Sequence, residues 1–238
     1  MSIYTAAELE AEGGSRELAD KLIDLVESYV ERWPDKFAIA LSPADVRAHF
    51  KDGLMSLPMG MENGSPIEGK LPNLKYFYDR GIRYLSFSHS LSNHLSDSSY
   101  DKEKKWQGLS DLGKQAVAEM NRLGIMIDVS HLSDDAFWQV MELSQVPVIA
   151  SHSSARHFTP GMERNMSDEM IGALANNGGV IQINFGSYFL TQQAREYGDA
   201  RWAAGKAYQA EHPDFTDTDL WTKYPAIYAA ENGPYPYA

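Results

Sequence analysis

The stretch IDVSHLSDDAFWQVMELSQVPVIASHSSAR, residues 127–156, contains two short apolar runs that both end in the dipeptide Ser-His. Between them lies a segment with helical periodicity, which begins at Ser133, a residue type suited to a helix N-cap. A third apolar run, GIRYLSFSHS at residues 81–90, also ends in Ser-His. The pattern predicts parallel strands separated by helices, with a histidine at the end of each strand.

The same alternation continues on both sides of this stretch. Helices are expected at residues 15–33, 42–50, 71–81, 109–124, 133–144 and 167–179, and strands at 53–62, 82–89, 125–131, 146–153 and 180–185. Ser42 and Ser110 are expected to be N-caps of their helices. No glycine-rich phosphate loop follows any of these strands, and the polar residues stand at the ends of several different strands. We therefore expect an α/β fold of the (β/α)8 TIM-barrel type rather than a doubly wound sheet.

Length and composition are those of one globular domain spanning residues 1–238, with a helical or irregular tail at 187–238. The net charge of -12 argues against nucleic-acid binding, and no apolar run approaches the roughly 18 residues of a membrane span. We expect no secretion signal, so a cytoplasmic location is the default. Because the chain has no cysteine, any metal must be held by histidine and carboxylate side chains.

Four strand-end residues are the strongest candidates for chemistry: Glu62, His89, His131 and His152. Adjacent parallel strands lie about 4.8 Å apart, so His131 and His152 are expected to meet at one end of the sheet. Two histidines and a carboxylate, here Glu62, are the ligands of a hydrolytic zinc site, in which the metal activates a water molecule. The competing interpretation is that each histidine is only a hydrogen-bonded residue at the rim of the sheet.

Other polar residues carry weaker signals. Arg156 and Arg164 follow the His152 strand, where a cation could hold a substrate carboxylate or simply face solvent. The His-Pro-Asp sequence at residues 212–214 has a chelating spacing but lies in a charged loop, and we interpret it as unrelated to the site. The remaining histidines, at positions 49, 94 and 157, are expected to be solvated. Asp128 is expected to play at most a supporting role.

The motifs resemble those of the membrane (renal) dipeptidases, a family of zinc metallopeptidases. The similar stretches run from about residue 53 to 186, in family order: MGMENG, GIRYLSFSHS, GLSDLGKQAVAEMNRLGIMIDVSHLSD, VPVIASHSSAR, RNMSDEMI and NNGGVIQINF. ERWPDKFAIALSPADV, which precedes them, is also similar. The resemblance implies a barrel that hydrolyses dipeptides with two zinc ions bridged by a glutamate. Homodimers are expected from the same analogy.

Individual roles follow from the resemblance. Glu62 matches the bridging carboxylate, and His131 and His152 match the histidines that complete the shell of one metal. His89 matches a histidine that contacts substrate and stabilises the tetrahedral intermediate, and Arg164 matches the arginine that engages the substrate's terminal carboxylate. The Glu-Asn-Gly that begins at Glu62 replaces the family's usual Glu-Gly-Gly.

Two parts of the family pattern have no counterpart here. The first barrel strand, which carries a His-x-Asp ligand pair, and the last strand are missing, so we expect strands two to seven in an open six-stranded sheet with one zinc. The leading hypothesis is a zinc-dependent dipeptidase. The alternative is a catalytically inactive truncated barrel or pseudoenzyme that binds one metal or a partner chain, and a third hypothesis is a metal-dependent hydrolase of lactones or other amides.

Overall fold

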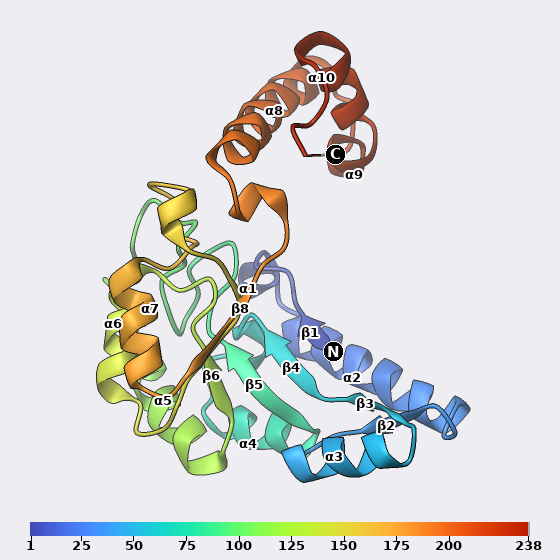
Figure 1. Ribbon diagram of the computed structural model, residues 1–238, viewed down its shortest axis with the longest axis vertical. Helices are drawn as coiled ribbons and strands as arrows, with labels where there is room; N and C mark the ends of the chain where they lie inside the picture. Colours follow the sequence, from blue (N-terminus) through green and yellow to red (C-terminus); the bar gives the residue numbers. More distant parts are fainter. Residues whose placement is uncertain (238) are drawn as a thin grey trace. The chain divides into compact units, whose positions relative to one another are not determined.

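A computed structural model describes residues 1–237 (Figure 1). The chain divides into two compact units: residues 1–152 with 169–182, and residues 153–168 with the chain from Ile183 on. The expectation of a single domain over residues 1–238 stays a prediction.

The first unit is built on a six-stranded sheet with the order β1-β4-β5-β6-β7-β8. Its strands are β1 (Ser2–Tyr4), β4 (Met59–Glu62), β5 (Ile82–Ser86), β6 (Met126–Asp128), β7 (Ile149–Ser153) and β8 (Val180–Ile183). The pairs from β1 through β7 are parallel. Neighbouring strands in this sheet follow one another along the chain as in successive β-α-β units, which confirms the expected α/β fold of barrel type. The sheet is open, with β1 and β8 at its edges.

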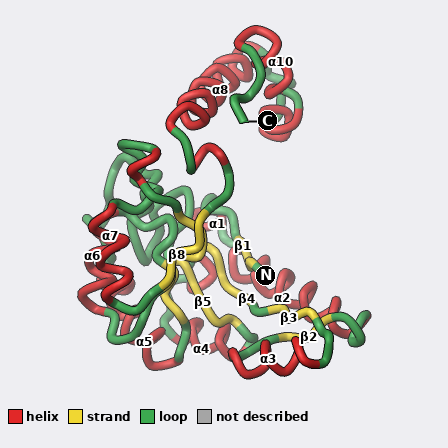
Figure 2. Tube along the Cα trace, viewed as in Figure 1, coloured by secondary structure: helices red, strands yellow, loops and turns green. Residues whose placement is uncertain are grey.

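Helices follow the strands along the outer side of this sheet (Figures 1 and 2). They are α1 (Leu9–Glu12), α2 (Ser15–Arg32), α3 (Pro43–Lys51), α4 (Pro72–Asp79), α5 (Asp111–Leu123), α6 (Asp134–Leu143) and α7 (Asp168–Asn176), with the short 3-10 helix η1 at Ser65–Ile67. The predicted N-caps are confirmed: the hydroxyls of Ser42, Ser110 and Ser133 accept hydrogen bonds from the backbones of Asp45, Gly113 and Ala136.

The alternation of side chains along the strands separates an apolar face from a polar one. Ile3, Met61, Leu85 and Ile127 are in register on neighbouring strands, and each is at most 1% exposed. The next row of the register carries polar side chains on the other face: Glu62, Ser86 and Asp128. Short strands therefore place three polar groups side by side near the carboxyl ends of β4, β5 and β6.

The sequence prediction differs from the structure in the N-terminal strands. The expected strand at residues 53–62 is divided into β3 (Met55–Leu57) and β4, and Pro58, which has no N–H to donate to a ladder, lies between them. β3 pairs with β2 (Phe37–Ile39) in a separate two-stranded sheet. Neither β2 nor β1 was predicted, and β1 supplies the sixth strand of the main sheet.

The second unit is mainly helical. It contains the 3-10 helices η2 (Arg156–Phe158) and η3 (Ser187–Phe189), followed by α8 (Gln192–Glu211), α9 (Asp217–Thr222) and α10 (Tyr224–Asn232). Aromatic side chains pack between the last helices, with the rings of Tyr208 and Tyr224 centred 5.4 Å apart. In residues 1–237 no helix combines the length and the apolar character needed to cross a bilayer.

Candidate metal centre

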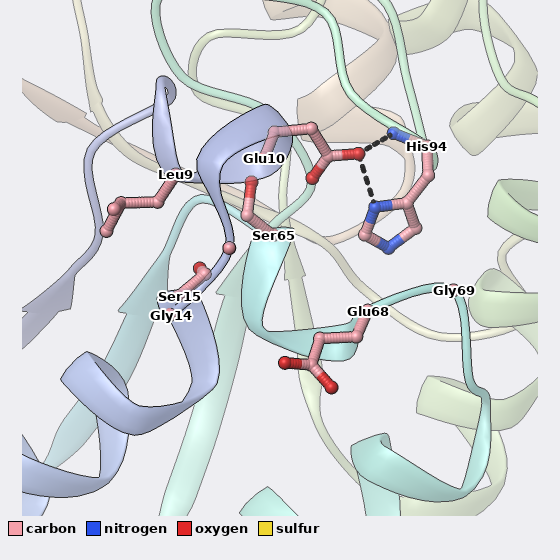
Figure 3. A pocket seen from close by; sticks show the side chains of 9 residues that line it. Leu9, Glu10, Gly14, Ser15, Ser65, Glu68, Gly69 and His94 are labelled. Atoms are coloured by element: carbon pink, nitrogen blue, oxygen red, sulfur yellow. Dashed lines mark hydrogen bonds and ion pairs between the residues drawn. The ribbon is translucent and has the colours of Figure 1, made fainter.

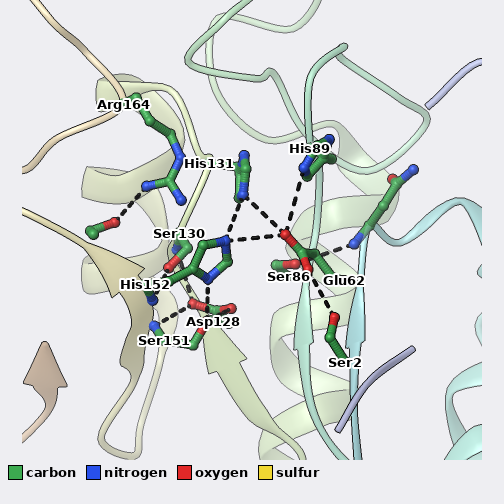
Figure 4. Close-up of polar contacts among 12 residues, drawn as sticks. Ser2, Glu62, Ser86, His89, Asp128, Ser130, His131, Ser151, His152 and Arg164 are labelled. Carbon is green, nitrogen blue, oxygen red and sulfur yellow. Dashed lines mark hydrogen bonds and ion pairs between the residues drawn. The ribbon is translucent and has the colours of Figure 1, made fainter. Parts of the chain in front are cut away.

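Three of the predicted histidines converge on one oxygen atom of the predicted Glu62. Glu62 Oε1 lies 3.1 Å from His152 Nε2, 3.3 Å from His131 Nε2 and 3.6 Å from His89 Nε2 (Figure 4). The other carboxylate oxygen of Glu62, Oε2, accepts a hydrogen bond of 2.8 Å from the hydroxyl of Ser2. Because Glu62 ends β4 and Ser2 begins β1, adjacent strands fix the orientation of this carboxylate.

Each histidine reaches Glu62 from a different strand. His152 lies within β7, His89 follows the end of β5, and His131 follows the end of β6. The backbone of His131 has φ of +71°, in the left-handed region that non-glycine residues rarely adopt. Its carbonyl accepts a hydrogen bond of 2.8 Å from the backbone N–H of Ser99, which helps to hold this conformation. The turn brings His131 Nε2 to 2.8 Å from His152 Nε2.

The histidines determine the charge of Glu62. Burial acts to raise the pKa of this carboxyl group, but hydrogen bonds with His131 and His152 outweigh burial and hold the pKa far below its usual range. The group is therefore an ionised carboxylate. On the same face of the sheet, burial and the nearby charges of Asp128 and Glu62 raise the pKa of Tyr84 to about 12, so its phenol stays protonated at neutral pH.

These donors fit a metal ion. Glu62 Oε1 and the Nε2 atoms of His131 and His152 lie 2.8, 3.1 and 3.3 Å from one another. Two ligands of a tetrahedral zinc ion, each at about 2.0–2.1 Å, are separated by roughly 3.3 Å, so the observed separations are close to those that zinc requires. Glu62, His89 and His131 also form a set whose ligand atoms all lie within 4.8 Å. The cluster thus offers two overlapping triads, which share Glu62 and His131.

The residues that support this cluster were not predicted from the sequence. Ser2 lies in a strand that was not predicted, and Ser151 received no role of its own, although it precedes His152 directly. The repeated Ser-His dipeptide was the available signal, because a serine beside a candidate ligand can hold either that ligand or its neighbour. Asp128, for which the sequence predicts at most a supporting role, lies beneath the cluster (Figure 4) and is 1% exposed.

The arginines belong to the second unit. Arg164 is 4% exposed, and its guanidinium donates a hydrogen bond of 2.8 Å to Ser153 Oγ. Arg156 donates to the backbone carbonyls of Asn165 and Glu163, at 2.7 and 3.0 Å, and so holds the loop that carries Arg164. The structure therefore gives Arg156 a local structural role.

The remaining histidines have identifiable contacts away from the cluster. His49 Nδ1 lies 2.9 Å from Ser56 Oγ, and the ring of His212 stacks on Tyr208 at 3.9 Å. The expectation that His94 is simply solvated is wrong, because its backbone N–H and Nδ1 both contact Glu10 Oε1, at 2.9 and 2.8 Å.

Glu10 and His94 line a separate cleft of about 370 Å³ (Figure 3). Burial acts to raise the pKa of Glu10, but its contacts with His94 and Ser65 lower the pKa overall, so Glu10 is ionised. Neither Glu62 nor the three histidines of the cluster line this cleft, whose residues are Leu9, Glu10, Gly13, Gly14, Ser15, Ser65, Glu68, Gly69 and His94.

Comparison with known proteins identifies similar sequences among dipeptidases. The family model described as Membrane dipeptidase (Peptidase family M19) matches residues 1–217. Dipeptidase aclJ of Aspergillus oryzae is 36% identical over 164 residues, which cover 68% of this chain and 39% of that protein. Dipeptidase tcpJ of Claviceps purpurea is 34% identical over 163 residues, which cover 68% and 38%. The chain thus spans about two fifths of the length of these curated relatives.

Solved structures of similar fold agree with this assignment. The probable dipeptidase PvdM from Pseudomonas aeruginosa has a TM-score of 0.75 and 29% identity, over 91% of this chain and 59% of that one. A metallo peptidase from Rhodobacter sphaeroides, liganded with a phosphinate mimic of the dipeptide L-Ala-D-Ala, has a TM-score of 0.70 and 29% identity, over 79% and 53%. The family match over residues 1–217 and the shared fold lead to one conclusion: the chain belongs to the membrane dipeptidase family.

Proposed function

We propose that this protein is a zinc-dependent dipeptidase, which hydrolyses the peptide bond of small dipeptides. The observation that carries the proposal is the convergence of three imidazole Nε2 atoms on Glu62 Oε1, at 3.1–3.6 Å. Support also comes from family membership and from the similar Rhodobacter sphaeroides enzyme, whose ligand mimics a dipeptide.

In this proposal Glu62, His131 and His152 hold one zinc ion. When bound, zinc would activate a water molecule and polarise the carbonyl group of the substrate. The chain's own contribution is the geometry of the ligands: Ser2 orients the Glu62 carboxylate, and the left-handed backbone at His131 turns its imidazole toward His152. The low pKa of Glu62 keeps its oxygen available as a ligand throughout the physiological pH range.

We assign substrate contact to His89 and Arg164. The side chain of His89 is 23% exposed, so a substrate can reach it, and its ring centre lies 4.2 Å from that of His131. A ring N–H of His89 would donate a hydrogen bond to the oxyanion that forms as water attacks the carbonyl. Arg164 is proposed to bind the free carboxylate of the dipeptide, because a guanidinium can form two parallel hydrogen bonds with a carboxylate.

Metal content and dipeptide hydrolysis test the proposal together. Purified protein should contain about one zinc per chain, and His131→Ala and His152→Ala should each lose both the zinc and the zinc-dependent hydrolysis of dipeptides such as L-Ala-D-Ala. The control is His157→Ala, since His157 lies outside the cluster and its ring contacts Phe158 instead. A folded protein that binds zinc but hydrolyses no dipeptide would refute the proposed activity, and one that binds no zinc would refute the metal site.

A further inference from the structure

The two ring nitrogens of His152 face different partners. Nε2 points into the cluster, 2.8 Å from His131 Nε2 and 3.1 Å from Glu62 Oε1. Nδ1 points away from the cluster and lies 2.7 Å from the hydroxyl oxygen of Ser151, the residue directly before it (Figure 4). In the metal-free cluster Nε2 faces the Glu62 carboxylate as a donor, but to bind a metal Nε2 must offer an electron pair, and the single proton of the neutral ring must then lie on Nδ1. The partner of Nδ1 therefore has to accept that proton.

Asp128 determines the direction of that hydrogen bond. The Ser151 hydroxyl lies 2.5 Å from Asp128 Oδ2, and the other oxygen of Asp128, Oδ1, accepts hydrogen bonds from the backbone N–H groups of Ser130 and Ser151 at 3.0 and 2.9 Å. Asp128 thus faces three donors, two backbone N–H groups and one hydroxyl, and acts as the acceptor, so the single hydroxyl proton of Ser151 goes to Asp128 Oδ2. The oxygen of Ser151 then has only electron pairs to offer, and His152 Nδ1 must be the donor.

We propose that Asp128 and Ser151 are positioning residues that place the proton of His152 on Nδ1 and so direct the electron pair of Nε2 at the metal site. This inference rests on the proposed metal-dependent function and deepens it. The hydrogen bonds run in one direction, from His152 Nδ1–H to Ser151 Oγ and from Ser151 Oγ–H to Asp128 Oδ2. Outer partners of this kind orient metal-binding histidines and raise their affinity.

The same contacts give the repeated Ser-His dipeptide a physical role. Ser151 holds the ring of His152, whereas Ser130, which precedes His131, accepts a hydrogen bond of 3.1 Å from the backbone N–H of His152. Ser151 in β7 and Ser130 just after β6 therefore both position His152, the first through its ring and the second through its backbone. Because Asp128 joins these two strands, its contacts could also serve only to hold the sheet together, and the experiment must separate the two roles.

Removal of the hydroxyl group tests the proposal. Ser151→Ala keeps the backbone N–H that bonds to Asp128 but removes the link to His152, and Asp128→Asn replaces the obligate acceptor. Zinc affinity, measured by competition with a chelator, should fall about 10- to 100-fold in both variants. Ser151→Thr, which retains a hydroxyl, should recover most of the loss. The matched control is Ser56→Ala, which removes the same type of serine–histidine contact from His49, outside the cluster, and should leave zinc affinity unchanged.

A second measurement makes the test independent of metal and of turnover. The ¹⁵N chemical shifts of the His152 ring in metal-free protein should report a proton on Nδ1 in the wild type and in Ser151→Thr, and a proton on Nε2 alone in Ser151→Ala, where Glu62 Oε1 is the remaining acceptor. A folded Ser151→Ala protein with wild-type zinc affinity and a proton still on Nδ1 would overturn the inference. If the wild type binds zinc but hydrolyses no dipeptide, the proposed function fails while the affinities still decide this inference. If it binds no zinc, the ring shifts alone decide it.

Discussion

At the scale of single residues, His89 has two candidate roles, as a metal ligand or as a substrate contact, and one variant distinguishes them. Its Nε2 atom is the most distant of the three histidine nitrogens from Glu62 Oε1, at 3.6 Å, yet it shares a potential ligand set with Glu62 and His131. The longer distance and the exposure of the side chain favour contact with substrate over metal binding.

His89→Ala should therefore keep its zinc while kcat falls about 10²- to 10³-fold, the usual cost of losing one oxyanion donor. Zinc content and kcat for dipeptide hydrolysis, measured on the same preparation, check this expectation. Loss of zinc in this variant would show instead that His89 is a ligand.

Gly60 illustrates how packing beneath the site limits substitution. Any Cβ at this position would collide with the ring of Tyr84 on the neighbouring strand. Gly60→Ala should lower the free energy of unfolding by about 1–3 kcal/mol, as overpacking usually does. The control is Gly172→Ala in α7, where a Cβ would meet no atom within 4 Å. There the higher helix propensity of alanine should raise the free energy of unfolding by about 0.5–1 kcal/mol. Urea unfolding of both variants tests the contrast, and equal effects of the same sign would contradict it.

At the scale of elements, helix ends are the features that local sequence specifies best. Ser42, Ser110 and Ser133 were recognised as N-caps because a cap needs only a side-chain oxygen and a backbone N–H three residues away. The strands β1 and β2 were not predicted, because their pairing depends on partners far along the chain.

The same reasoning applies to the candidate site. The ligand types and their strands could be predicted from the Ser-His endings, but Ser2 and the hydrogen-bonded path through Ser151 could not. Those contacts depend on the register between strands, which brings Ser2 beside Gly60, and on rotamers that no local pattern encodes.

Helix α9 provides a pH-dependent test at this scale. Contacts with Lys223 and Thr216 lower the pKa of Asp219 to about 2, as part of a capping box at the start of the helix. Since the unfolded carboxyl titrates near pH 4, the stabilisation is complete above about pH 4 and is lost as the pH falls toward 2.

Asp219→Asn should thus lower the Tm at pH 7, and its difference from the wild type should disappear between about pH 4 and pH 2. Thermal unfolding followed by circular dichroism measures this, with Asp214→Asn, an exposed acidic residue outside the helix, as the control. A difference that persists at pH 2 would show that the cap does not act through the charge of Asp219.

At the scale of the whole molecule, net charge opposes association between copies of the chain, whereas an exposed sheet edge favours it. The net charge of -12 keeps copies of the chain apart, whereas β8 lies at an edge of the sheet and exposes Val180 and Ile183 at 50% and 46%. Unpaired edge strands with apolar side chains favour pairing with a second chain. Association should therefore depend on how strongly salt screens the repulsion.

Light scattering should detect larger species as the salt concentration rises from 0.01 to 1 M, because the screening length shortens from about 30 to about 3 Å. Val180→Lys should suppress this association, since a charged residue on an edge strand opposes pairing. Leu25→Lys, on the exposed side of α2 at 46%, provides a matched control. Association that is unchanged in Val180→Lys would place the contact elsewhere.

The division of the chain into units has a consequence for biosynthesis. Residues 169–182 complete the first unit, yet residues 153–168, which belong to the second, leave the ribosome before them. A nascent chain that has exposed residues 1–152 therefore keeps β7 at the edge of its sheet until β8 emerges. At translation rates of about 5–20 residues per second this interval lasts on the order of seconds, during which β7 is an unpaired edge strand of the growing chain.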